Sequence, residues 1–363
     1  MLLYLSRSRP LLGRKYPQWG RCFSQNAPQY SSDPLRVLFC GSDDFSCASL
    51  QAVFAEHSEN KNLIESLDVM VLPPKRTGRV PCKLLAEDLG LRIHQRETFT
   101  KWDLPEGTNI VIAVSFGLFV PPRILRAAKY GGLNVHPSLL PDLRGPAPIH
   151  HAILKGYDRT GVSLQTLDDK AFDHGTVLAQ TPRPGISIPS GCTVQELTKL
   201  LAPIGAQMLV QGLRDGVHVP PPSDQKWKAE ELDEEKLTHA PKVTKADGHV
   251  NWTRWTADEI VRRLRVLGSV WTHAVNNKGE TKRLIIQDAE VVPSEDSGID
   301  TANVQFVQMP DLGTFEVMVS DHGGGTCAIP TVGGNLLRVK KIKEEGKPER
   351  DAMVVLKGYS KTR

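Results

Sequence analysis

Apolar residues between about residue 35 and residue 215 fall into short runs that alternate with amphipathic stretches. The apolar runs predict strands at 36–40, 66–72, 109–115, 132–136 and 162–167. Helical spacing between these runs predicts helices at 46–56, 81–89, 121–129, 147–155 and 193–213. Because strands alternate with helices, we expect an α/β fold. Its mostly parallel sheet with right-handed crossovers would form a Rossmann-like domain over residues 34–214.

The pattern changes beyond residue 214. Residues 215–240 combine a run of prolines with many acidic side chains, which is typical of a linker that runs over the surface. Residues 241–363 then contain one helical stretch and several short strand-like runs between Gly-rich turns, at 257–267, 270–275, 283–286, 314–319 and 335–339. Short strands at regular spacing predict a smaller second domain that folds as a β-barrel.

The formal net charge of +4 originates at the N-terminus. Residues 1–32 contain five basic residues and no acidic one, which leaves 40 of the 45 basic residues against 41 acidic residues. An acid-free leader rich in Arg, Ser and Leu is typical of a mitochondrial transit peptide. We therefore predict a transit peptide at residues 1–33 with cleavage near Ser24, and a mature protein in the mitochondrial matrix. Binding of nucleic acid by the near-neutral body would need local basic patches.

Several classes of protein receive little support. No apolar stretch approaches the length of a membrane span. The turn after the first predicted strand reads GSDD, which lacks the glycine fingerprint of dinucleotide-binding proteins. The six cysteines have no paired spacing, so we expect free thiols in a reducing compartment and no metal site.

The segment NVHPSLLPDLRGPAPIH, residues 134–150, contains the main candidate for a catalytic site. Asn134 and His136 are two residues apart at the end of a predicted strand, so their side chains project to the same face. An amide donor and an imidazole suit chemistry at a carbonyl group. Asp173, in a downstream Asp-x-Gly turn, would orient and charge the imidazole, although Asp168 and Asp169 are alternatives for this carboxylate.

These motifs resemble a known family. Asn-x-His, SLLP, an RG-x-x-P-I segment and Asp-x-Gly about 35 residues later are similar to the formyltransferases that use 10-formyltetrahydrofolate. The SLLP form, the segment KRTGR at 75–79 and the long C-terminal part narrow the resemblance to the methionyl-tRNA formyltransferases. One departure is Pro137, at a position where the family usually has Gly.

The resemblance implies a reaction and roles for residues. Formyl would pass from 10-formyltetrahydrofolate, a co-substrate, to the amino group of initiator methionyl-tRNA. Asn134 and protonated His136 would hold the oxyanion, and Asp173 would keep His136 charged. The pterin would lie against two segments that the sequence supplies, namely Phe116, Gly117 and Leu118, and Ser138, Leu139, Leu140 and Pro141.

The expected tRNA contacts are basic. One group is on a Gly-Pro loop at 73–83, and the second is on a strand of the C-terminal domain, which the resemblance makes OB-like. The residues are Lys75, Arg76, Arg79, Lys83, Arg338, Lys340 and Lys341. We expect a monomer.

Three other classes of function fit parts of the pattern. Glycinamide ribonucleotide formyltransferase and the hydrolase domain of formyltetrahydrofolate dehydrogenase share the Asn, His and Asp but lack a basic C-terminal domain. A non-catalytic RNA-binding protein is disfavoured by the intact catalytic residues, and an oxidoreductase by the missing glycine fingerprint.

Overall fold

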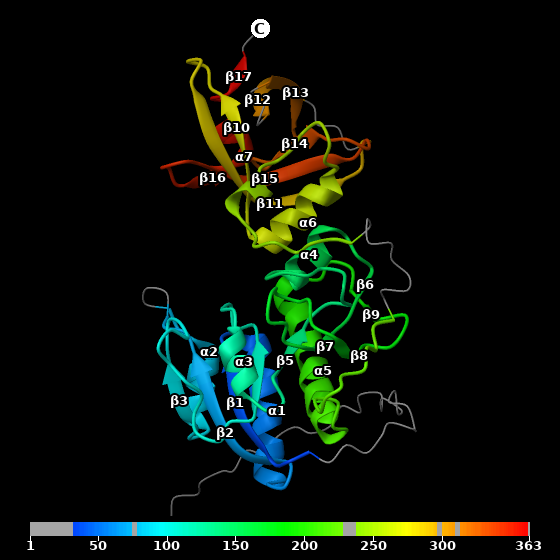
Figure 1. Ribbon diagram of the computed structural model, residues 1–363. Coiled ribbons are helices and arrows are strands. Elements are labelled where there is room, and N and C mark those ends of the chain that lie inside the picture. Colours follow the sequence, from blue (N-terminus) through cyan, green and yellow to red (C-terminus); the bar gives the residue numbers. More distant parts are fainter. Residues whose placement is uncertain (1–31, 75–77, 228–236, 296–299, 309–312, 362–363) are drawn as a thin grey trace, which may run out of the picture.

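The chain forms an α/β domain followed by a β-barrel domain in the computed structural model, which describes residues 32–74, 78–227, 237–295, 300–308 and 313–361 (Figure 1). In the first domain the strands are β1 Leu35–Gly41, β2 Ile64–Val71, β3 Arg92–Gln95, β4 Ile110–Val114, β5 Gly132–His136, β6 Arg159–Thr160, β7 Ser163–Thr166, β8 Val177–Gln180 and β9 Ile186–Ser187. Its helices are α1 Asp44–Glu59, α2 Pro81–Asp88, α3 Pro122–Ala127, α4 Pro148–Leu154 and α5 Val194–Arg214.

The sheet of the first domain has the order β3-β2-β1-β4-β5-β7-β8. Strands β3 to β5 pair in parallel, whereas β7 and β8 join antiparallel. The prediction of a mostly parallel sheet is confirmed. The central strand β4 is buried along its whole length, as a strand covered on both faces must be. The direction of strand order reverses between β1 and β4, and open α/β sheets bind ligands at such a switch point.

Local sequence explains where the long helices begin. The Asp43 side chain accepts a hydrogen bond from the Ser46 N–H at the start of α1. A capping box of Thr193 and Glu196 starts α5. The predicted helices agree with the observed ones to within a few residues, and β3 is a strand that the sequence pattern did not predict.

The second domain contains the strands β10 Val270–Val275, β11 Thr281–Val292, β12 Asp300–Gln308, β13 Gly313–Asp321, β14 Cys327–Pro330, β15 Leu336–Glu344, β16 Glu349–Asp351 and β17 Ser360–Lys361. Its helical segments are η3 Lys245–Gly248, α6 Ala257–Leu267 and α7 Ala352–Leu356. The sheet follows the order β10-β11-β15-β14-β13-β12, and pairing of β10 with β12 closes it. The predicted barrel is confirmed, although β12, β14 and α7 were not predicted.

The predicted linker is only partly a surface connection. Ala240 is completely buried and belongs to the core of the first domain. Its N–H donates to the Arg144 carbonyl, and its own carbonyl accepts from the Ala147 N–H. The end of the linker is thus hydrogen-bonded to the loop after β5. Beyond it, α6 packs near α4, and Arg265 Nε donates to the Cys192 carbonyl at 3.0 Å.

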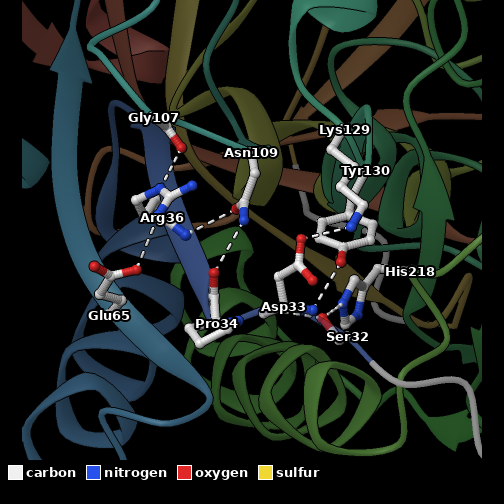
Figure 2. A network of polar contacts seen from close by, with 10 residues as sticks. All are labelled: Ser32, Asp33, Pro34, Arg36, Glu65, Gly107, Asn109, Lys129, Tyr130 and His218. Carbon is white, nitrogen blue, oxygen red and sulfur yellow. Dashed lines mark hydrogen bonds and ion pairs between the residues drawn. The ribbon is translucent and has the colours of Figure 1, made fainter.

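Polar contacts fix the chain just before β1 (Figure 2). The Asp33 carboxylate pairs with Lys129, and the Asp33 N–H donates to the Tyr130 hydroxyl at 2.8 Å. Ser32 Oγ lies 2.9 Å from Nε2 of His218. Burial lowers the pKa of His218 to about 4, so this ring is neutral at neutral pH. The ordered body of the first domain therefore includes residue 32.

Candidate active site

A cavity of about 580 Å³ lies at the carboxyl ends of β1, β4 and β5. Its walls come from the start of α1, from residues 113–120 after β4, from residues 134–137 at the end of β5, from residues 145–150 and from residues 165–173. The lining surface is mainly apolar with a few polar groups. A pocket of this kind suits a flat organic ligand whose reacting group meets fixed polar atoms.

The three predicted catalytic residues meet at this cavity. His136 Nδ1 lies 3.3 Å from Asp173 Oδ1, and both side chains are nearly buried, at 6% and 12% exposure. Asp173 Oδ2 also accepts a hydrogen bond from the Gly145 N–H at 2.9 Å. Asn134 lines the same cavity. The Asn, His and Asp that the sequence pointed to therefore lie together in the structure.

The two other candidate carboxylates have their contacts elsewhere. Asp168 Oδ1 accepts from the N–H groups of Lys170 and Ala171 and so shapes its own loop. Asp169 forms a surface ion pair with Arg126 at 3.0 Å. Of the three carboxylates, Asp173 is the one that lies beside the His136 imidazole.

His136 and Asp173 stabilise each other's charge. Burial by itself lowers the pKa of His136, but the Asp173 carboxylate and a hydrogen bond to the Leu143 carbonyl together raise it above its ordinary value. Burial likewise raises the pKa of Asp173, yet His136 and the donors around the carboxylate lower it below its ordinary value. Both shifts favour an imidazolium paired with a carboxylate, and the acceptors beside both ring nitrogens agree with this state.

Both ring nitrogens of His136 have protein partners. Nδ1 faces Asp173, and Nε2 lies 3.0 Å from the Leu143 carbonyl oxygen. The expectation that His136 directly holds an oxyanion therefore needs correction for this arrangement, because no ring N–H is left over. Asn134 Nδ2 donates one hydrogen to the Ala113 carbonyl at 2.9 Å. The second hydrogen of Asn134 Nδ2 makes this residue better placed than His136 to donate a hydrogen bond to an oxyanion.

Two glycines allow the loops of the site to close on each other. A side chain at Gly145, where φ is +122°, would put Cβ 2.5 Å from the Ala240 carbonyl oxygen. At Gly175, Cβ would lie 1.7 Å from the Thr166 carbonyl oxygen. These close approaches fix the loop that carries Asp173 and the loop that supplies the Gly145 N–H.

The predicted pterin walls divide into two groups. Phe116, Gly117 and Leu118 line the cavity, as expected. The other segment does not line the cavity. It contains Ser138, Leu139, Leu140 and Pro141. Contact of these four residues with the ligand stays a prediction. Ser138 instead stabilises the loop after β5, because its hydroxyl donates to the Asp142 carbonyl of the same loop at 2.7 Å.

Comparison with known proteins defines the family. A model of the formyl transferase family matches residues 36–213, and a model of the formyl transferase C-terminal domain matches residues 242–360. The chain is 32% identical to the methionyl-tRNA formyltransferase of Cereibacter sphaeroides, over 72% of this chain and 84% of the relative. The chain belongs to the methionyl-tRNA formyltransferase family.

Relatives named mitochondrial are equally similar. Identity is 31% to the mitochondrial methionyl-tRNA formyltransferase of Homo sapiens, over 71% of this chain, and 29% to that of Saccharomyces cerevisiae, over 86% of both chains. The match spans 65% of the human relative and 60% of the bovine one. Among solved structures, WlaRD, a sugar 3N-formyl transferase, shares the fold with a TM-score of 0.53 at 14% identity, over 87% of this chain and all of WlaRD.

The basic residues of the loop at 73–83, which the family resemblance assigned to tRNA, differ in their surroundings. Lys75 and Arg76 lie outside the described residues. Arg79 is exposed in the loop before α2, and Lys83 faces Glu87 on α2 at 3.8 Å.

The cations of β15 are matched by acids. Arg338 lies 3.2 Å from Glu290. Lys340 is also 3.2 Å from Glu290, and Lys341 pairs with Asp351. The register between β11 and β15 is irregular here, and the buried positions of β15 change from odd numbers, Leu337 and Val339, to even numbers, Ile342 and Glu344, while the three cations stay partly exposed. The expected free basic patch on β15 is thus a charge-paired surface.

Gln165 is a member of the site that the sequence analysis missed. It lies on β7 directly opposite Asn134 and lines the cavity. The available signal was a carboxamide on the strand that precedes the Asp-x-Gly turn. Within the part of the chain that the structure describes, no cluster of three potential metal ligands occurs, and no helix is long and apolar enough to cross a membrane.

Proposed function

We propose that the protein transfers the formyl group of 10-formyltetrahydrofolate to the amino group of initiator methionyl-tRNA. The observation that carries this proposal is the buried His136–Asp173 ion pair beside Asn134, at the base of an apolar cavity in a methionyl-tRNA formyltransferase fold. Relatives with this name match most of the chain.

The proposed chemistry is addition to a carbonyl followed by elimination. The amine nitrogen attacks the formyl carbon, the bond from that carbon to N10 breaks, the amine gives up a proton and N10 takes one. Asn134 Nδ2 donates to the oxygen that becomes negative, a contribution of about 3 kcal/mol for one donor. The His136 imidazolium adds a fixed positive charge nearby, and Asp173 keeps the imidazolium protonated and oriented. Asp173 also suits removal of the amine proton through a water molecule.

The cavity supports a folate as formyl donor. Phe116, Gly117 and Leu118 offer apolar contacts and backbone groups of the kind that bind a flat heterocycle. For the tRNA, the exposed Arg79 is the best described candidate, next to Lys75 and Arg76. The β15 cations would have to exchange their acidic partners for phosphates.

We further propose that the protein works in the mitochondrial matrix and that the leader ends before residue 32. The names of the human and yeast relatives and the acid-free leader support this location. Since Ser32 and Asp33 hold the body of the first domain, cleavage near Ser24 leaves these contacts intact. That the protein acts as a monomer remains a prediction.

The test is transfer of labelled formyl from 10-formyltetrahydrofolate to charged initiator methionyl-tRNA by residues 24–363. His136→Ala is run beside it, with His57→Ala, a histidine of α1 outside the cavity lining, as matched control. We expect label on methionine with the wild type and the control, and none with His136→Ala. If the wild type binds folate but leaves the tRNA unlabelled, the acceptor is wrong and small amines become the next candidates.

A further inference from the structure

We propose that Gln165 is a positioning residue that sets the orientation of the Asn134 carboxamide and locks Asp173 in place. This role rests on the function proposed above and extends it to a residue that acts through its hydrogen bonds to two candidate catalytic side chains. Gln165 would act only through the two side chains that it joins, on β5 and on the loop after β7.

The geometry connects one amide nitrogen to two catalytic side chains. Gln165 Nε2 donates to Asn134 Oδ1 at 3.1 Å and to Asp173 Oδ1 at 3.1 Å. These bonds use both hydrogens of that nitrogen. The residue is only 1% exposed, and β5 and β7 hold it directly across from Asn134. Its side chain therefore has little freedom to reach other partners.

The contact decides which end of the Asn134 carboxamide faces which neighbour. In the observed orientation, Asn134 Oδ1 accepts from Gln165 and Asn134 Nδ2 donates to the Ala113 carbonyl. A flipped carboxamide would set two donors against each other at Gln165 and two acceptors against each other at Ala113. Gln165 thus keeps an N–H of Asn134, and not its oxygen, available beside His136, where an oxyanion needs a donor.

The same contact completes the cradle of Asp173. Oδ1 receives Gln165 Nε2 and lies next to His136 Nδ1, while Oδ2 receives the Gly145 N–H. A carboxylate held by donors from three directions cannot rotate away from the imidazolium. The donor on Gln165 also contributes to the low pKa of Asp173.

The remaining atom of Gln165 argues against a purely structural role. Gln165 Oε1 is buried and has no hydrogen-bond partner in the described part of the chain. An unpaired buried acceptor costs about 1–3 kcal/mol. An apolar side chain of the same length would avoid this penalty but would lose the two bonds of Nε2, so we expect the carboxamide to contribute little net stability.

The test compares Gln165→Met with Gln180→Met. Methionine keeps the length of the side chain and removes both donors. Gln180 is the matched control, because it is 9% exposed on the neighbouring strand β8 and its Nε2 donates to the Leu140 carbonyl and to Ser163 Oγ, both at 2.8 Å. It touches neither Asn134 nor Asp173 through these bonds.

We expect Gln165→Met to lower kcat for formyl transfer by about 10-fold to 100-fold, the range that follows loss of a hydrogen-bond partner that orients a metal ligand. The KM values for folate and tRNA should change less than threefold, and the melting temperature should stay near that of the wild type. Gln180→Met should lower the melting temperature more than it lowers kcat. The proposal is overturned if kcat of Gln165→Met stays within threefold of wild type, or if the loss of activity merely follows a loss of stability in both variants.

A second readout does not depend on the reaction. The two side-chain N–H resonances of Asn134, assigned with Asn134→Asp, should be sharp and separate in the wild type and in Gln180→Met. They should broaden or merge in Gln165→Met because the carboxamide becomes free to flip. Unchanged Asn134 resonances in Gln165→Met would contradict the positioning role. A wild type that transfers no formyl but still shows this broadening in the variant would instead contradict the proposed function alone.

Discussion

Asp173→Asn removes one charge from the site and leaves its shape almost unchanged. The carboxylate lies 3.3 Å from His136 Nδ1. At an effective dielectric constant of about 20, two unit charges at this separation attract by about 5 kcal/mol. The variant loses this attraction, and burial then lowers the pKa of His136 below its ordinary value. We therefore expect a neutral imidazole at neutral pH.

The expected loss of activity follows from this change. The Leu143 carbonyl still binds Nε2, so part of the orientation of His136 survives. We expect kcat of Asp173→Asn to fall by about 100-fold to 10,000-fold, which corresponds to about 3–5 kcal/mol of the transition-state free energy. The alkaline limb of its pH–rate profile should move to lower pH, because His136 loses its proton earlier. The assay is transfer of labelled formyl to methionyl-tRNA between pH 5.5 and pH 9.

Stability supplies an independent check. The raised pKa of His136 contributes stability that is complete below its unfolded value, about 6.5, and is lost as pH rises through the folded value. The lowered pKa of Asp173 contributes stability above about 3.9, which is lost as pH falls through the folded value. The difference in unfolding free energy between wild type and Asp173→Asn should be larger at pH 5.5 than at pH 9 in urea titrations. Equal differences at both pH values, or activity within threefold of wild type, would refute the assignment of a charged pair.

Three further outcomes follow from the contacts. Gly175→Ala should destabilise the first domain by about 3 kcal/mol or more, seen as a lower melting temperature, because the new methyl group meets a backbone oxygen of β7. A chain of residues 35–363 should melt below one of residues 32–363, since it lacks the hydrogen bonds and the ion pair that hold the N-terminal segment in Figure 2. Arg79→Ala should raise the KM for tRNA several-fold in steady-state assays, whereas Lys340→Ala, whose ammonium group already faces Glu290, should change it less than twofold.

The catalytic residues could be predicted from the sequence because their signals are local. Asn134 and His136 share a face through strand periodicity, and Asp173 is marked by its turn. The partners of these residues depend on pairing between distant segments. The Leu143 carbonyl reaches His136 only because the loop after β5 folds back, and Gln165 reaches Asn134 only in one antiparallel register. A sequence pattern carries no information about that register.

Contacts between distant segments also explain why the sequence did not predict the pairing of the β15 cations and the burial of Ala240. The cations of β15 form a basic run in the sequence, but acids of β11 and β16 lie opposite them in the barrel. Ala240 follows a charged stretch and was therefore placed on the surface, yet backbone hydrogen bonds to the loop at 144–147 bury it. Whether the cations are paired and whether Ala240 is buried thus depends on strands or loops at least 10 residues away in the sequence.

Backbone conformation links the linker to the catalytic chemistry. Among the described residues other than Gly, Lys101, Ser115, Leu143 and Asp173 have positive φ, and the last three lie at or beside the cavity. Each such residue costs about 1–3 kcal/mol and persists only where its surroundings hold it. At Leu143 the restraint comes from the linker, because the Leu143 N–H donates to the Thr238 carbonyl at 2.7 Å. The carbonyl of that same strained residue binds His136 Nε2. A shift of the segment that leads into the barrel domain would therefore move the Leu143 carbonyl that binds His136 Nε2.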